Sequence, residues 1–280
     1  MSKRYIRKVN TKTHQNYKVN IEEYNSANEL AGDIAGKTIK NGGWHEPECR
    51  DWSGVRSYDE ALNLLRNGYE PVVNRLKAKV KDMSFYHEKR MAFRNALVGF
   101  APVVPLALMG VPNSMLDVKV KPMKTKVINV YYDMTCSCGT SSEQIIKNGE
   151  NLLGAIMELE AKGYKFNLYC VQGYSDRQDC DMLVVKVKSS NQPFDIKRMS
   201  FPLTHTAFFR VIGFDWYGKA EFTKYRGGYG HALAYEFGAS TKEVYKQIFG
   251  DNAVFFTGTE MKGKEQAYLK EVLENDSQKR

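Results

Sequence analysis

A carboxylate and two hydroxyls at alternate positions are the chain's clearest candidates for chemistry. The segment Asp133-Met-Thr135-Cys-Ser137 follows a run of β-branched and aromatic residues and precedes the polar start of a helix. Alternation points the side-chain oxygens of Asp133, Thr135 and Ser137 the same way. One carboxylate with neutral hydroxyls suits Mg²⁺ or Mn²⁺, hard cations that prefer oxygen ligands. The segment therefore predicts a divalent-metal site, although Asp, Thr and Ser are also ordinary caps of a following helix.

A second hydroxyl-rich segment, Leu203-Thr204-His205-Thr206-Ala207, lies further along the chain. With both segments the chain resembles the von Willebrand factor A family, in which an Asp-x-Ser-x-Ser loop follows the first strand. A long helix, two strands and then a threonine loop come next in that family. The resemblance implies a metal-ion-dependent adhesion site made by Asp133, Thr135, Ser137 and Thr204. Such a site would hold an acidic residue of a protein partner through the metal.

The chain departs from this family in two places. Cys136 and Cys138 stand where small residues are usual, and the expected strand at 253–256 runs into Thr257-Gly258, where the family has an aspartate before the glycine. The resemblance covers roughly residues 124–260. The acidic ligand that it leaves open has four candidates: Glu260, Asp251, Asp215 and Glu236.

Enzymatic constellations have less support. His205 has no nucleophile and no orienting carboxylate placed with it by sequence. The Cys-x-Cys at Cys136 and Cys138 precedes a helix, where a thiolate is stabilised, but buried thiols are the commoner case. The His, Glu and Cys residues of 42–49 match no zinc spacing. Because no phosphate-binding glycine-rich loop is present either, we expect a binding protein rather than an enzyme.

A basic N-terminal segment predicts an alternative function. Residues 1–20 hold six basic and no acidic side chains, with Tyr5 and Tyr17 among them. Such an arm can follow phosphates, although it can also be a solvated terminus. The run 225–231 mixes arginine, aromatic residues and glycine, as in RNA-contacting loops. The alternative is therefore DNA or RNA binding through these residues: Lys3, Arg4, Arg7, Lys8, Lys12, Lys18 and Arg226.

The elements that must position these residues predict an α/β fold. Strand patterns at 126–132, 164–171, 182–187 and 253–256 alternate with helical patterns at 142–162 and 240–249. The order predicts an open sheet with flanking helices. The resemblance makes this sheet von Willebrand A-like, which is a Rossmann-like arrangement.

The N-terminal part has a different pattern. Helical patterns at 26–40, 57–66 and 69–98 predict a mainly helical region after the basic arm. The apolar segment 100–111, broken by two prolines, is expected to be extended and buried between the two parts. We therefore expect a basic and helical region at 1–122 and the A-like domain at 123–280.

Composition fits a folded protein of the reducing cytoplasm. The 280 residues are 42% hydrophobic and 26% charged, with a net charge of +9 and five cysteines. No run approaches the roughly 18 apolar residues of a membrane helix, so no membrane partner is expected. The chain as a whole is also similar to proteins encoded by tailed phages. The partner's identity and the oligomeric state stay open.

Overall fold

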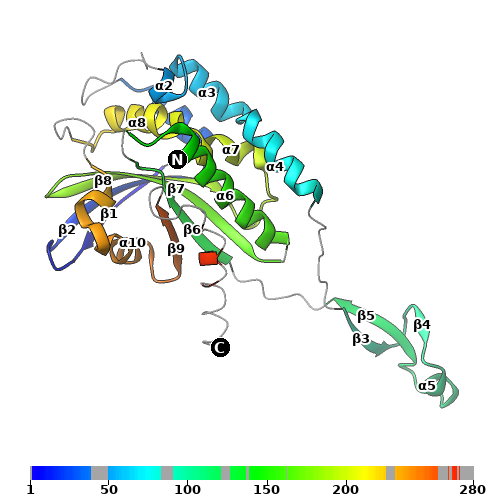
Figure 1. Cartoon of the computed structure of the whole chain (residues 1–280). Coiled ribbons are helices and arrows are strands. Elements are labelled where there is room, and N and C mark those ends of the chain that lie inside the picture. Colours follow the sequence, from blue (N-terminus) through cyan, green and yellow to red (C-terminus); the bar gives the residue numbers. More distant parts are fainter. Residues whose placement is uncertain are drawn as a thin grey trace.

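The computed structural model describes residues 2–38, 50–82, 91–120, 127–136, 139–161, 163–224 and 231–257, together with 264, 267–269 and 271. Figure 1 shows the helices and strands along the chain. In chain order they are β1 (Lys3–Val9), β2 (Tyr17–Tyr24), α1 (Ala27–Ala35), α2 (Arg50–Ser53), α3 (Tyr58–Asn67), α4 (Glu70–Asp82), β3 (Met91–Ala96), β4 (Ala101–Pro102), α5 (Val104–Leu108), β5 (Met115–Val120), β6 (Val127–Asp133), α6 (Ser142–Ala161), β7 (Lys165–Ser175), β8 (Asp179–Lys188), α7 (Ile196–Thr204), the π-helix η1 (Phe208–Gly213), α8 (Phe214–Lys219), α9 (Leu233–Phe237), the 3₁₀-helix η2 (Gly238–Ser240), α10 (Thr241–Phe249) and β9 (Ala253–Thr257).

A six-stranded mixed sheet forms the centre, in the order β1-β2-β8-β7-β6-β9. The pairs β2–β8, β6–β7 and β6–β9 are parallel, whereas β1–β2 and β7–β8 are antiparallel. Helices cover both faces: α3, α4, α6 and α7 lie on one side of the sheet in Figure 1 and α10 lies on the other. The predicted α/β class, an open sheet with flanking helices, is confirmed.

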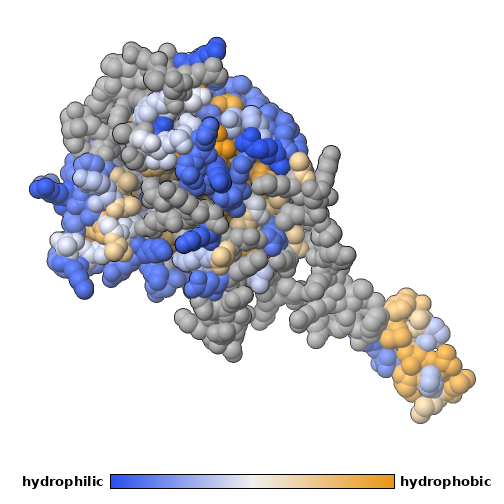
Figure 2. All heavy atoms as spheres, viewed as in Figure 1, coloured by the Kyte–Doolittle hydropathy of each residue, from blue (hydrophilic) through white to orange (hydrophobic). Residues whose placement is uncertain are grey.

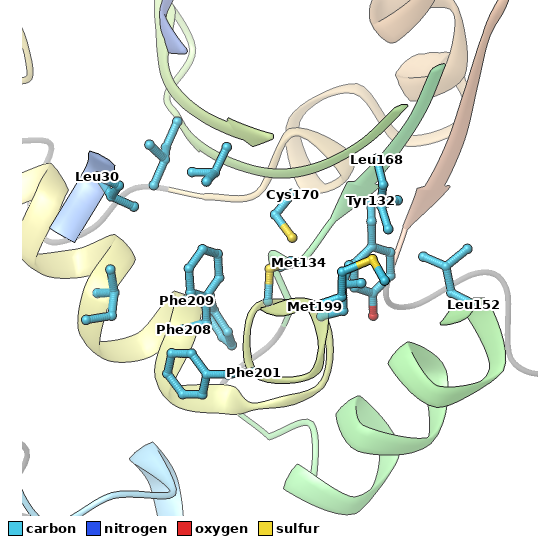
Figure 3. Packing of buried hydrophobic residues seen from close by; sticks show 14 of the residues in the cluster. Leu30, Tyr132, Met134, Leu152, Leu168, Cys170, Met199, Phe201, Phe208 and Phe209 are labelled. Atoms are coloured by element: carbon cyan, nitrogen blue, oxygen red, sulfur yellow. The ribbon is translucent and has the colours of Figure 1, made fainter. Parts of the chain in front are cut away.

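Strand side chains alternate between two apolar layers. In β6, Val130 and Tyr132 join the larger layer with helices α1, α3, α4, α6 and α7, whereas Tyr131 joins the smaller layer with α9 and α10. Figure 3 shows the larger layer, in which Met134 and Cys170 from the sheet side face Phe208 and the helices. This period of two is what a strand buried on both faces requires.

The basic N-terminal segment is part of the sheet. Tyr17, Val19 and Ile21 alternate into the smaller apolar layer, and β2 pairs in parallel with β8, from Lys18 opposite Asp179 onward. The expected arm is therefore an edge hairpin: its charged positions point to solvent while the apolar positions of β2 hold it to the sheet. The alternation of Tyr17, Val19 and Ile21 indicates a strand, but the basic residues around it suggested a solvated arm.

The two sides of the expected boundary at residue 122 share one core. Ser57 caps α3 by accepting from the Glu60 N–H, as its capping-box spacing predicts. Helices α1, α3 and α4 then place Leu30, Leu65 and Val72 in the same apolar layer as β6. Residues 121–126 themselves lie outside the described part of the chain.

Residues 91–120 form a second, three-stranded sheet in the order β3-β5-β4, with α5 at its tip. Figure 1 shows it apart from the six-stranded sheet, and none of its described residues belongs to either apolar layer. The expectation of a buried, extended segment at 100–111 is wrong: Val104 to Leu108 form a short helix, and Phe100 and Leu108 are exposed. Apolar character predicts burial only where another surface covers it.

Candidate functional site

Asp133 ends β6 at the carboxyl edge of the sheet and is buried. One of its carboxylate oxygens accepts from the Thr135 backbone N–H at 2.9 Å, and the other accepts from the Tyr245 hydroxyl at 2.5 Å. Burial, and then the Asp133 charge, raise the pKa of Tyr245, so that phenol stays protonated and donates. Asp133 thus joins its own loop to α10.

Two of the predicted metal ligands, Asp133 and Thr204, lie on opposite sides of the sheet. Tyr245 belongs to the smaller apolar layer, so the Asp133 carboxylate faces the α10 side of the sheet. Thr204 ends α7 on the opposite side and donates its hydroxyl to the Ser200 carbonyl at 2.6 Å. Its methyl lies beside Gly149, about 10 Å along α6 from the start of that helix.

Of the two remaining predicted ligands, Thr135 and Ser137, the structure describes Thr135. The Thr135 hydroxyl accepts from the Gly173 N–H at 3.4 Å, and Ser137 lies outside the described residues. Within the described ranges, no three or more His, Cys, Asp and Glu side chains form a group that could hold a metal.

Two of the four candidates for the missing acidic ligand have other contacts. Asp215 forms an ion pair with Lys219 at 2.8 Å, and Glu236 contacts His14 at 2.9 Å. Asp251 is exposed in the turn before β9, and Glu260 lies outside the described residues. Thr257 is the residue that pairs with Asp133 across β6 and β9, and its hydroxyl is buried without a hydrogen-bond partner.

Arg210 is a site residue that the sequence did not reveal. Its buried guanidinium donates to the Thr140 carbonyl at 3.2 Å and to the Trp52 carbonyl, and it lies 5.0 Å from the Trp52 ring centre. Burial raises the pKa of the nearby Cys136 thiol, and the Arg210 charge opposes that rise. Arg210 thus fixes the loop after β6, and its positive charge disfavours a cation there.

His205 and Thr206 serve the local structure. The Nδ1 atom of His205 accepts from the Ala207 N–H at 3.1 Å, and the Thr206 hydroxyl donates to the Ser53 carbonyl at 2.9 Å. Burial lowers the pKa of His205 from 6.5 to about 4, so the imidazole is neutral near pH 7. The Thr206 contact ties the segment after α7 to the end of α2.

The structure brings the predicted basic residues together. Six of them lie on the β1–β2 hairpin, and all six are exposed: Lys3, Arg4, Arg7, Lys8, Lys12 and Lys18. The seventh, Arg226, lies outside the described residues, as do the residues of 42–49. We call the six the basic hairpin.

The basic hairpin presents charge on both faces of an edge strand. Lys3 and Arg7 flank the Tyr5 ring, at 5.4 and 5.3 Å from its centre. Lys8 and Lys18 lie directly opposite each other in the antiparallel register. Like charges in that position repel, which an anion would relieve. The hairpin is therefore an edge with an electrostatic preference for anions.

Arg4 differs from the other members of the basic hairpin. It forms ion pairs with Glu22 at 2.8 Å and Glu221 at 3.0 Å. The Glu22 carboxylate is buried and also accepts from the Trp216 indole N–H at 2.8 Å. Arg4 therefore compensates a buried charge, and its removal would leave Glu22 underpaired.

Comparison with known proteins gives one family. The family described as a domain of unknown function (DUF7192) matches residues 7–276. No curated protein and no solved structure has a significant match to the chain. Over the described residues, no helix has the length and apolar character needed to cross a bilayer.

Proposed function

The chain belongs to the DUF7192 family, and we propose that it is a non-enzymatic nucleic-acid-binding protein whose basic hairpin contacts phosphates. The observation that carries this proposal is the gathering of six exposed basic side chains on one edge hairpin. Between Lys3 and Arg7 the strand rises about 13 Å, close to four steps of 3.4 Å along one DNA strand. Contacts of this kind position a protein without reading sequence.

The test is the salt dependence of binding. Five residues are changed together to glutamine, with Arg4 kept because it pairs with buried Glu22: Lys3, Arg7, Lys8, Lys12 and Lys18. The slope of log K against log salt should become shallower by up to about 4.5 for duplex DNA, at 0.9 per phosphate contact, and by up to about 3.5 for a single strand. Gel-shift titrations over a salt series measure it.

A matched control removes the same charge elsewhere. Five exposed lysines outside the hairpin are changed to glutamine: Lys77, Lys165, Lys197, Lys242 and Lys246. An equal change of slope in both variants would mean that net charge alone drives binding, and no detectable binding by the unaltered protein at low salt would refute the proposal. Deletion of residues 2–18 is unsuitable, since it removes β1 and the start of β2 from the sheet.

We also propose that the sheet is von Willebrand A-like. Its support is the order of elements: β6 with Asp133 at its end, the long helix α6, the two strands β7 and β8, and then α7 with Thr204. The expected later strand, β9, lies directly beside β6. The strands β1 and β2 extend this arrangement at the β8 edge.

A metal-dependent grip on a protein partner has less support. Asp133 is buried and already accepts two hydrogen bonds, while Thr204 faces the other layer. Binding of Mg²⁺ or Mn²⁺ at Asp133 would compete with the Tyr245 hydroxyl for the buried carboxylate. The metal site stays a prediction, and the substitutions at Tyr245 and Asp133 described below test it.

A further inference from the structure

An apolar groove lies within the basic hairpin, between its strands and Phe222. Its volume is about 270 Å³, and six residues line it: Arg4, Tyr5, Ile6, Asn20, Ile21 and Phe222. The Ile6 side chain is 62% exposed. Figure 2 shows the described surface of the six-stranded domain as mostly hydrophilic in its view, with small hydrophobic areas among the charged residues. A hollow with apolar walls on such a surface is a candidate binding site.

A pair of lysines lies on the same face of the hairpin as the groove. Arg4, Ile6 and Lys8 share one face of β1, because side chains two residues apart point the same way. In the antiparallel register Asn20 lies opposite Ile6 and Lys18 lies opposite Lys8. Residues directly opposite each other lie on the same face of a sheet. The two exposed lysines are therefore about 7 Å along the strands from Ile6.

The acidic side chains around this lysine pair are already engaged. Three of them, at neighbouring positions of the strands, have partners within 3.1 Å: Glu22 with Arg4, Glu23 with Tyr5 and Asp179 with Lys224. Residues 10–16, which connect the two strands, include no acidic residue. Lys8 and Lys18 repel each other in their opposed positions, and a bound phosphate would relieve this repulsion. One end of the groove thus favours an anion.

A nucleobase with its phosphate has the chemistry that both parts require. The two faces of a base stack on apolar and aromatic side chains, and its phosphate is attracted to lysine. A cavity of about 150 Å³ holds a benzene ring, so a groove of about 270 Å³ has room for one base. The Arg4 guanidinium, 5.4 Å from the centre of the Phe222 ring, adds a second flat group to the wall.

We propose, building on the function proposed above, that the basic hairpin binds single-stranded nucleic acid, with one unstacked base in the groove and its phosphate at Lys8 and Lys18. In a duplex the faces of the bases are stacked on one another, so they cannot enter a groove. The lining holds mostly apolar side chains, which contact the face of a base and do not read its edge. Binding should therefore be tolerant of sequence.

An acidic protein segment that adds a strand to β1 is the main competing occupant. β1 is the outermost strand at its side of the six-stranded sheet. Four of its seven residues are lysine or arginine. Charged side chains on an edge strand, lysines above all, hinder pairing with a further strand. The composition of β1 therefore favours an occupant that binds side chains, as a nucleotide does.

The experiment compares three fluorescent probes of equal length by anisotropy with the full chain: a thymidine oligomer, an abasic strand with the same phosphates, and a duplex. We expect the thymidine oligomer to bind about fivefold or more tightly than the abasic strand, the lower end of what one stacked base contributes. Ile6→Ser should remove this preference and leave binding of the duplex unchanged. It removes no charge, so the slope of log K against log salt should stay the same.

Two further variants complete the test. Leu108→Ser removes an exposed aliphatic side chain of the three-stranded sheet and should leave the preference for the thymidine oligomer unchanged. Phe222→Leu keeps an apolar side chain beside Trp216 but lacks the flat ring, so it should reduce the preference. Melting curves check that all three variants fold.

Three outcomes would overturn the proposal while leaving the phosphate contacts of the basic hairpin in place. The first is equal binding of the thymidine oligomer and the abasic strand by the unaltered chain. The second is a preference for the thymidine oligomer that both Ile6→Ser and Phe222→Leu retain. The third is binding of an alternating glutamate–valine peptide that Ile6→Ser abolishes while the thymidine oligomer is unaffected, which would assign the groove to an added strand. Absence of binding to all three nucleic-acid probes at low salt would refute the proposed function and this inference together.

Discussion

Asp133 carries a buried carboxylate whose two oxygens accept from different parts of the chain. The Thr135 N–H belongs to the loop after β6, and the Tyr245 hydroxyl belongs to α10. A buried acceptor that loses its donor keeps its full desolvation cost. The pair therefore holds the carboxyl edge of the sheet to the helix that covers its smaller apolar layer.

Replacing Tyr245 by phenylalanine should lower the unfolding free energy by about 1.5–3 kcal/mol, the usual contribution of a hydrogen bond to a charged group. Urea denaturation measures this change, with Tyr235→Phe, at an exposed position, as the neutral control. A loss below about 0.5 kcal/mol would mean that the Asp133–Tyr245 bond is not formed in solution.

The same variant examines the metal prediction. If Mg²⁺ binds at Asp133, it competes with the Tyr245 hydroxyl, so Tyr245→Phe should increase the rise in melting temperature that Mg²⁺ causes. Asp133→Ala should then remove that rise. Identical melting curves with Mg²⁺ and with chelator in all three proteins would leave Asp133 a structural residue.

His205 makes stability depend on pH. Its folded pKa of about 4 lies below the ordinary 6.5, chiefly because of burial, with the Glu60 charge opposing the shift. The stabilising contribution is complete above pH 6.5 and is lost as the pH falls toward 4. Between pH 7.5 and 5 the expected loss is about 2 kcal/mol of unfolding free energy. In His205→Gln this part of the pH dependence of the unfolding free energy should vanish. A pH profile of the variant that runs parallel to that of the unaltered protein would contradict the prediction.

At the scale of elements, α6 and α7 approach each other at a glycine. A Cβ built on Gly149 would lie 2.1 Å from the Leu203 carbonyl oxygen, whereas one on Gly154 of the same helix meets nothing within 4 Å. Gly149→Ala should therefore cost more than about 2 kcal/mol, since backbone must move. Gly154→Ala should add about 0.5–1 kcal/mol through helix propensity. Thermal unfolding of the two variants measures both changes in stability. Equal changes would rule out the close approach of α6 and α7 at Gly149.

Periodicity predicts the elements that are buried on a regular face. The strand at 126–132, the helix at 142–162 and the strand at 253–256 agree with β6, α6 and β9 to within a few residues. Charge and prolines misled elsewhere. The basic positions of β1 hid an edge strand whose partner β2 alternates Tyr17, Val19 and Ile21. The apolar segment 100–111, which was expected to be buried, has exposed side chains in the three-stranded sheet of residues 91–120.

The sequence predicts which basic residues lie together at the surface, but it does not predict the contacts that the buried site residues make. The six basic residues share a hairpin because they are close in sequence. The partner of Asp133 is 112 residues away in α10, and Arg210 reaches its loop from the π-helix. No local pattern encodes which face of the sheet receives Asp133 or Thr204, because that depends on how the sheet is covered.

At the scale of the whole molecule, the basic hairpin and the exposed apolar residues of 97–109 belong to separate sheets. The basic hairpin is an edge of the six-stranded sheet, and the exposed apolar residues are in the three-stranded sheet of residues 91–120. Their substitutions share no contacts, so their effects should add.

The pairing of β2 with β8 also determines how long β2 lacks its partner strand while the chain is synthesised. Lys18 pairs with Asp179, so a ribosome working at about 5–20 residues per second completes β8 roughly 8–30 seconds after β2. A two-stranded hairpin is marginal by itself in water. Until β8 has been synthesised, Tyr17, Val19 and Ile21 of the nascent chain are uncovered. The six positive charges beside them keep these side chains hydrated and apart from other chains.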